Sequence, residues 1–159
     1  MLSSLLNENM SMRCCAYLCA LVLLAPALAA GQIAPAAGRI KVATGTASIV
    51  RGGQPRAALP GATIVEGDIL RTGADGRLSA MLKDESRVAL GPNSELTLTR
   101  FAYAPSDAQL GLGWQLARGV LSYVSGLIAK LAPEAVRLQT PTSIIGVRGT
   151  HVLVRAGAP

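Results

Sequence analysis

Apolar and polar residues alternate along most of the chain in short segments, with the two-residue period of a β-strand. In RLSAMLK (77–83), leucine and alanine alternate with arginine, serine, methionine and lysine, and the same pattern recurs in RVAL (87–90) and ELTLT (95–99). We find no helical periodicity sustained over more than about two turns. Each segment is therefore predicted to form a strand with one buried and one solvated face.

Turn-forming residues separate these segments at even intervals, in EGD (66–68), DG (75–76), DES (84–86) and GPN (91–93). The Asp-Gly pair between two apolar runs predicts a two-residue type I′ hairpin, because glycine accepts a positive φ. The EGD segment has paired carboxylates, but its composition favours a tight turn over a carboxylate site. The pattern predicts an all-β fold of stacked short antiparallel strands, either a β-solenoid or a β-sandwich.

Three later segments are less regular. Residues 105–113 are predicted to form a surface loop. Residues 114–124 are predicted to form two strands joined at Arg118-Gly119. Residues 127–131, which precede Pro133, fit either a strand or one turn of helix.

The N-terminal segment, residues 1–29, has the features of a secretory signal peptide. Arg13 precedes an apolar run over residues 16–28, and Ala27 and Ala29 have the spacing that signal peptidase accepts. We therefore predict export to the periplasm, with cleavage at about this point. An uncleaved membrane anchor is the alternative, which the shortness of the apolar run disfavours.

The predicted organisation follows from this signal. Residues 1–11 are a possible upstream extension of it, residues 30–38 a flexible spacer of small residues, and residues 39–156 the β domain. The mature protein is predicted to have no membrane span of its own.

Composition narrows the classes of partner. The formal net charge is +6, but the arginines are scattered and no basic run predicts a patch. The charge leaves open an anionic envelope polymer or lipid headgroup as a ligand. Aromatic residues make up 3% of the chain, too few to stack bases, so nucleic acid is not an expected partner. All three cysteines precede the predicted cleavage point, which leaves the mature chain without a thiolate metal ligand.

The remaining residues predict no enzyme, no cofactor and no metal site. The chain has one histidine and no G-x-S-x-G segment that would present a serine nucleophile. It has no Walker A sequence, and GLG (111–113) does not extend into a nucleotide-binding glycine loop. We therefore assign no catalytic residue.

The segment GVRGTH near the end of the chain is the candidate interaction or structural motif. It consists of Gly146, Val147, Arg148, Gly149, Thr150 and His151. In the structural interpretation, Val147 is core, the glycines allow a positive φ or close backbone approach, and Arg148 ties loops together. In the functional interpretation, Arg148 and His151 are exposed and contact a partner or an anionic ligand. Glycines between β segments usually mark bulges or turns, which favours the structural interpretation.

From about Gly45 to Val154, the chain resembles the FecR domain family. The resemblance rests on EGDILRTG (66–73), LGPNS (90–94) and GVRGT (146–150), which are specific in combination. It implies an all-β domain that faces the periplasm. In the regulators of this family, it implies signal relay from an outer-membrane receptor to a cytoplasmic sigma factor.

The expected function is that of a non-enzymatic periplasmic module for protein interaction or signal sensing in the cell envelope, with an unknown envelope protein as partner. One alternative is binding of an anionic glycan or lipid headgroup. Another is a remnant of an anti-sigma regulator of iron-uptake signalling, although only about a dozen residues precede the signal, too few to fold and hold a sigma factor. An exposed final strand would offer a site for strand addition by a partner.

Overall fold

Strands make up most of the chain that the structure, a computed structural model, describes, namely residues 34–147 and 151–157. The chain divides into two units, Met1–Ile33 and Ala34–Pro159, and the described residues all belong to the second. The strands are β1 (Ala36–Thr44), β2 (Ala47–Arg51), β3 (Gln54–Ala57), β4 (Thr63–Val65), β5 (Ile69–Thr72), β6 (Arg77–Leu82), β7 (Arg87–Leu90), β8 (Glu95–Ala104), β9 (Gln109–Val124), β10 (Val136–Gln139), β11 (Ile144–Gly146) and β12 (His151–Ala156). The helical elements are the 3₁₀ turns η1 (Pro105–Asp107) and η2 (Pro133–Ala135) and the single-turn helix α2 (Leu127–Leu131).

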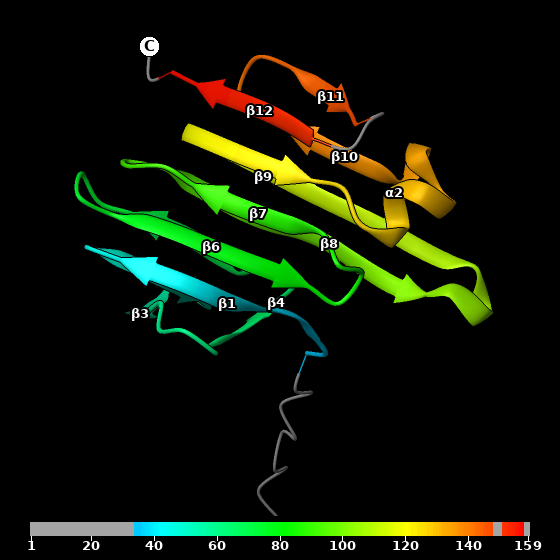
Figure 1. Ribbon diagram of the computed structural model, residues 1–159, viewed down its shortest axis with the longest axis horizontal. Coiled ribbons are helices and arrows are strands. Elements are labelled where there is room, and N and C mark those ends of the chain that lie inside the picture. The colour runs from blue at the N-terminus through cyan, green and yellow to red at the C-terminus, as the bar shows by residue number, and fades with distance from the viewer. Residues whose placement is uncertain (1–33, 148–150, 158–159) are drawn as a thin grey trace, which may run out of the picture. The chain divides into compact units, whose positions relative to one another are not determined.

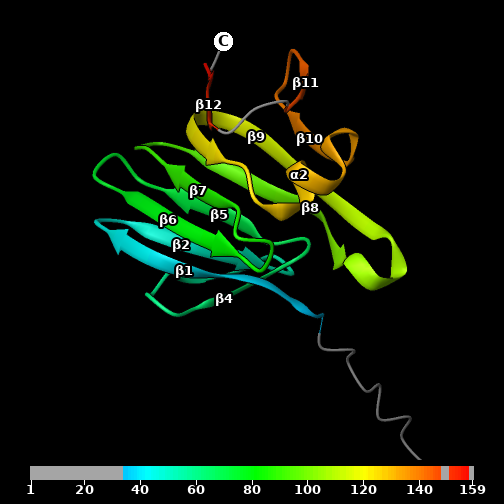
Figure 2. The same cartoon turned by 45° about the vertical axis from the view of Figure 1, so that its right-hand side comes forward.

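The long strand β9 joins two sheets. Its second half pairs with β7 and β12, and β7 continues through β6 and β1 to β4; we call this the front sheet. Its first half pairs with β8 and β10, and these continue through β5, β2 and β3 on one side and β11 on the other; we call this the back sheet. The front sheet lies nearer the viewer in Figure 1, and the turned view in Figure 2 shows β2 and β5 behind β1, β6 and β7. The strands thus form one continuous twelve-stranded sheet in the described part of the chain, which curls at β9 so that its front and back parts face each other.

One pairing departs from the predicted antiparallel pattern. Strands β9 and β10 are parallel, with Val136 opposite Leu112 and Leu138 opposite Trp114. Parallel neighbours need a crossover connection, and α2 with η2 provides it. The segment for which strand and helix were both open is thus one turn of helix.

The inward faces of the two sheets form one core, and the predicted strand faces are confirmed. Leu78, Leu82, Val88, Leu96 and Leu98 are each at most 3% exposed. They belong to a single cluster of buried side chains drawn from both sheets. The all-β fold class predicted from the alternation is therefore confirmed.

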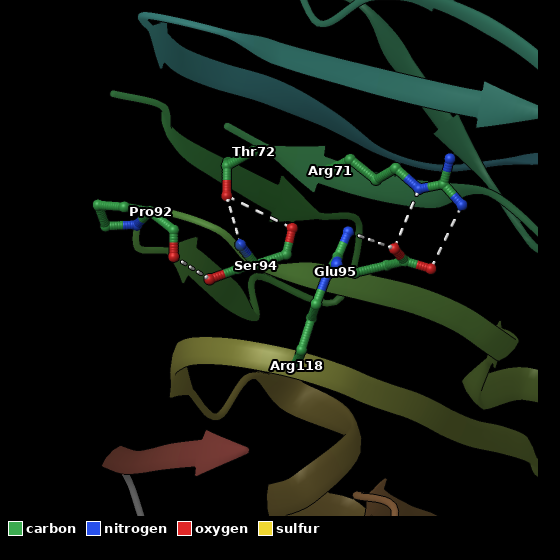
Figure 3. A network of polar contacts seen from close by, with 6 residues as sticks. All are labelled: Arg71, Thr72, Pro92, Ser94, Glu95 and Arg118. Carbon is green, nitrogen blue, oxygen red and sulfur yellow. Dashed lines mark hydrogen bonds and ion pairs between the residues drawn. The ribbon is translucent and has the colours of Figure 1, made fainter. Parts of the chain in front are cut away.

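The predicted break at Arg118-Gly119 is wrong, because β9 runs through it as one strand of 16 residues. Gly119 has φ +93°, and the register with β8 shifts beside it, between Glu95 and Leu96. This bulge lies where β9 passes from the back sheet to the front sheet. There the Ser94 hydroxyl accepts a hydrogen bond from the Val120 amide (2.9 Å), beside the network shown in Figure 3.

The predicted surface loop over residues 105–113 is also mostly wrong. Only η1 and Ala108 interrupt the chain there, and β9 begins at Gln109. Gly111 and Gly113 lie against β8, where the Arg100 side chain and the Thr99 hydroxyl, respectively, occupy the space that a Cβ would need. Small residues that read as loop in the sequence are therefore positions of close packing in the sheet.

The hairpin predicted at Asp75-Gly76 does not form. Strand β5 pairs with β2 and β8, whereas β6 pairs with β1 and β7, so this turn carries the chain from the back sheet to the front sheet. Gly76 serves close approach rather than a positive φ, since a Cβ there would lie 2.1 Å from the Thr46 carbonyl oxygen. Hydrogen bonding from the Thr46 side chain and from the Thr46 backbone amide (3.2 Å) to the Asp75 carboxylate lowers the pKa of Asp75.

The spacer predicted over residues 30–38 ends too late. Strand β1 begins at Ala36, and Ala37 is fully buried. Gly38 packs so tightly that a Cβ would lie 2.5 Å from the Met81 carbonyl oxygen. Small residues allow this contact, and the same small residues suggested a flexible linker.

Candidate functional site

Three rows of side chains cross the outer face of the front sheet. The middle row consists of Val42, Ser79, Ala89, Ser122 and Leu153. The row on one side consists of Arg39, Met81, Arg87, Val124 and His151. The row on the other side consists of Thr44, Arg77, Val120 and Arg155. Each row runs across the strands from β1 to β12, so residues distant in sequence become neighbours.

A β-bulge in β1 adds a further cation to this face. The register between β1 and β6 shifts between Ile40 and Val42, so that Lys41 has no opposite residue. Ile40 points into the core and is 1% exposed, while Lys41 and Val42 are both exposed. Bulges commonly re-aim side chains near functional sites, and this one places an ammonium group beside the middle row.

The face is hollowed along its middle row, where the side chains are small. One hollow of about 400 Å³ is lined by Ser79, Ala89 and Ser122 together with Lys41 and Arg87. A second, of about 320 Å³, shares the same three small residues and continues toward the row of Arg77. A third, of about 300 Å³, shares Lys41 and continues along β1. We call this continuous depression the trough.

The charges of the two sheets are balanced differently. On the back sheet, Arg71 and Arg118 converge on Glu95, at 3.2 and 3.4 Å from its Oε2 atom (Figure 3). The Arg51 guanidinium pairs with Asp68 at 2.7 Å. Three other back-sheet arginines, Arg56, Arg100 and Arg137, make no ion pair in the described part of the chain. The front-sheet cations make none at all with any residue that the structure describes. They are Arg39, Lys41, Arg77, Arg87 and Arg155.

The predicted motif contributes to this face only in part. His151 begins β12, and its Nε2 atom lies 2.8 Å from the Ser122 hydroxyl at the edge of the trough. Val147 is core, as the structural interpretation expects, and is 2% exposed. Gly146 has neither a positive φ nor any atom near the position of a Cβ, so the expectation for this glycine is wrong. Arg148, Gly149 and Thr150 lie outside the described residues.

Comparison with known proteins gives the family. Residues 68–159, more than half of the chain, match the family described as FecR protein. The chain belongs to the FecR family. The match begins at Asp68, so β1 to β4 lie before it. Neither the curated proteins nor the solved structures give a match.

Membership makes the FecR domain a regulatory or signalling module of an envelope-associated family. Within residues 34–147 and 151–157, no helix is long and apolar enough to cross a membrane. In the same part of the chain, no three acidic, histidine or cysteine side chains are grouped so as to hold a metal ion.

The FecR domain also contains a buried polar cluster that sequence reasoning missed. The Ser86 hydroxyl donates to Asp84 (2.6 Å) and accepts from the Gly126 amide (3.1 Å). It also lies 3.3 Å from the hydroxyl of Tyr123. Asp84 and Ser86 are fully buried, and the cluster fixes the β6–β7 turn to the chain leaving β9. The DES segment was correctly predicted to form a turn. Its contacts with Tyr123 and Gly126 could not be predicted, because these residues are distant in sequence.

Burial raises the pKa of Tyr123 to about 12, above its usual value near 10. The folded state therefore favours the protonated phenol. The contribution of Tyr123 to the free energy of unfolding is complete below about pH 10 and is lost as the pH rises through about 12. We expect the wild type to lose up to about 2–3 kcal/mol of stability over this window from this group alone. Urea titrations near pH 8 and near pH 11 should show about half of this loss, roughly 1.4 kcal/mol. Tyr123→Phe should reduce it, whereas Tyr103→Phe, at a partly exposed tyrosine, should not; equal losses in all three proteins would contradict the assignment.

Proposed function

We propose that this FecR domain is a non-enzymatic protein-interaction module of the periplasm, and that it binds its partner by strand addition to β12. The observation that carries the proposal is the outer edge of β12, which pairs with no strand in the described part of the chain. An unpaired edge presents backbone donors and acceptors to an incoming strand. The periplasmic location is supported by the predicted signal peptide, which lies outside the described residues.

The other sheet edges are blunted, whereas β12 is not. Strand β3 contains Pro55, which cannot donate a backbone hydrogen bond. Strands β4 and β11 have only three residues each, and the Thr63 carbonyl of β4 already accepts a hydrogen bond from Arg51 (2.9 Å). Strand β12 has six residues and no proline. It is therefore the edge best suited to pairing with another chain.

The pairing of β9 shows which amides of β12 face outward. The Gly91 amide donates to the Val120 carbonyl (3.0 Å), so Val120 and every second residue after it face β7. The residues between them, Leu121 and Tyr123, face β12. Their partners in register are Val154 and Val152. The backbone groups of Leu153, between these two, consequently point away from β9.

Leu153→Pro should abolish strand addition while leaving the pairing of β12 with β9 intact. Proline removes an N–H group that faces outward, and an edge strand tolerates it there. With the mature domain, residues 30–159, as bait in envelope extract, we expect a partner retained by wild type to be lost by this variant. Leu153→Ala keeps the amide and shortens the side chain, which is 70% exposed, so it should retain the partner.

Two controls keep this test decisive. The melting temperature of Leu153→Pro must stay near that of wild type, and Val152→Pro, which removes an inward amide, should lower it. Amide exchange in β12 should slow when the retained partner is added to wild type. Retention of the same partner by a folded Leu153→Pro variant would refute strand addition at this edge.

A further inference from the structure

The trough on the front sheet is a second surface, separate from the β12 edge, with a shape of its own. Its floor is the row of Ser79, Ala89 and Ser122. The flanking rows lie two residues away along each strand, about 7 Å on either side, and five strands span about 19 Å. The walls are thus about 14 Å apart, enough to seat one α-helix of about 10–12 Å diameter across the strands.

The charge of this surface is of one sign. Five cations surround the floor, and the front-sheet strands from which they project carry no aspartate or glutamate: AAGRIKVAT, RLSAML, RVAL, the GVLSYV end of β9 and HVLVRA. The nearest acidic residues in sequence, Asp75, Asp84 and Glu85, lie in the turns at either end of β6, and Asp84 is fully buried. The floor of the trough is uncharged, and the side chains around it are positively charged and make no ion pair in the described part of the chain. Such a surface complements an anionic ligand.

Apolar side chains in the same surface decide the class of ligand. Val42, Val124 and Leu153 are 53%, 37% and 70% exposed and lie among the cations, with Met81 partly buried beside them. An anionic polysaccharide would leave this apolar surface in contact with water. A flat membrane would not reach the small residues of the floor. A polypeptide with both acidic and apolar side chains matches the charge, the apolar groups and the concave shape together.

We propose that the trough binds an acidic amphipathic helix of a partner protein, about 13 residues long, which lies across β1, β6, β7, β9 and β12. Its apolar side chains pack on the floor and against Val42 and Leu153. Its carboxylates meet Arg39, Lys41 and Arg87 on one wall and Arg77 and Arg155 on the other. This gives the domain a binding surface that does not depend on strand addition at β12.

The proposal is tested with a helix-stapled synthetic peptide of about 14 residues, with leucines at positions i, i+3, i+4 and i+7 and glutamates elsewhere. Titrated by fluorescence anisotropy against the mature domain, it should bind saturably. A sequence-scrambled peptide of the same composition should bind at least about tenfold more weakly, and a lysine-for-glutamate peptide should not bind. Equal binding of the scrambled peptide would contradict the proposal that the trough recognises an amphipathic helix.

Variants of the domain locate the binding surface. The double variant Arg77→Glu, Arg87→Glu reverses one cation on each wall and should weaken the peptide at least about tenfold. The matched control is Arg56→Glu, Arg137→Glu on the back sheet, where both arginines are also exposed; it has the same net charge and should bind as wild type. Equal weakening in both double variants would show non-specific attraction and refute the site.

A second variant tests the floor independently of charge. Ala89 is exposed at the centre of the trough, so Ala89→Trp should fill it without disturbing the core and should reduce peptide binding at least about tenfold. Undiminished binding by Ala89→Trp would refute a helix seated on the floor.

If polygalacturonate or phosphatidylglycerol vesicles bind more tightly than the stapled peptide, the proposal that the ligand is a protein is wrong, and the ligand is a glycan or a membrane instead. Because Ala89 lies on β7, away from the free edge of β12, Ala89→Trp should leave strand addition intact, so that loss of peptide binding can be observed separately from loss of strand addition.

Discussion

Gly119→Ala should lower the free energy of unfolding by about 2–5 kcal/mol, from a left-handed backbone that L-residues avoid and from overpacking. Gly119 has φ +93° at the point where β9 crosses between the sheets. A Cβ there would lie 2.1 Å from the Ser94 hydroxyl and 2.5 Å from the Ser94 Cα. Neither atom can move easily, because the Ser94 amide donates to Thr72 (2.9 Å) and its hydroxyl contacts Pro92 and Val120.

The matched control for this prediction is Gly146→Ala. Gly146 has no positive φ and no atom within 4 Å of the Cβ position, so the substitution should change stability by less than about 0.5 kcal/mol. Urea denaturation followed by tryptophan fluorescence gives both values, since the single tryptophan, Trp114, is buried in the core. Equal midpoints for the two variants would show that the crossing does not depend on Gly119.

The faces of the strands could be predicted from sequence because burial is a local pattern. In β6, β7 and the first half of β8, every second residue is buried, and the alternation follows directly from the geometry of a strand. The turns at residues 66–68, 84–86 and 91–93 were predicted for a similar reason, because their residue types favour turn conformations wherever the strands go. The FecR resemblance, seen in the sequence, is confirmed by the family match.

Strand partners could not be predicted, because pairing is decided by tertiary packing. Asp75-Gly76 has the composition of a hairpin turn, yet β5 and β6 lie in different sheets. Gly119 has the composition of a chain reversal, yet it is a bulge within β9. Glycine in both places meets a contact from elsewhere in the chain, Thr46 in one case and Ser94 in the other. A local pattern contains neither partner.

The candidate site was hidden from sequence for the same reason. Its cations come from four strands, at positions as distant as Arg39 and Arg155, and in sequence they read as scattered. Only the register of the front sheet brings them around one floor. The GVRGTH segment drew attention because its residue types are concentrated, yet of its described residues only His151 reaches the trough.

Arg51→Met should lower the free energy of unfolding by about 3–5 kcal/mol, because it leaves a buried carboxylate without its cation. Asp68 is fully buried, and both its oxygens accept hydrogen bonds from Arg51, each at 2.7 Å. The hydrogen bonds to Asp68 also raise the pKa of Arg51. Through Thr63, the same guanidinium ties β2 of the back sheet to β4 of the front sheet.

The double variant Arg51→Met, Asp68→Asn separates the buried charge from the lost contacts. Asparagine is neutral, and its side-chain oxygen can still accept the hydrogen bond that the Val65 amide now donates to Asp68 (2.9 Å). We therefore expect the double variant to lose only about 1–2 kcal/mol, less than Arg51→Met alone, because a hydrogen bond between neutral groups costs less to disturb than an unpaired buried charge. Urea denaturation of wild type, both single variants and the double variant completes the cycle. A double variant less stable than Arg51→Met would mean that the Asp68 carboxylate is stabilised by its remaining neighbours, and that the ion pair is not what holds β2 to β4.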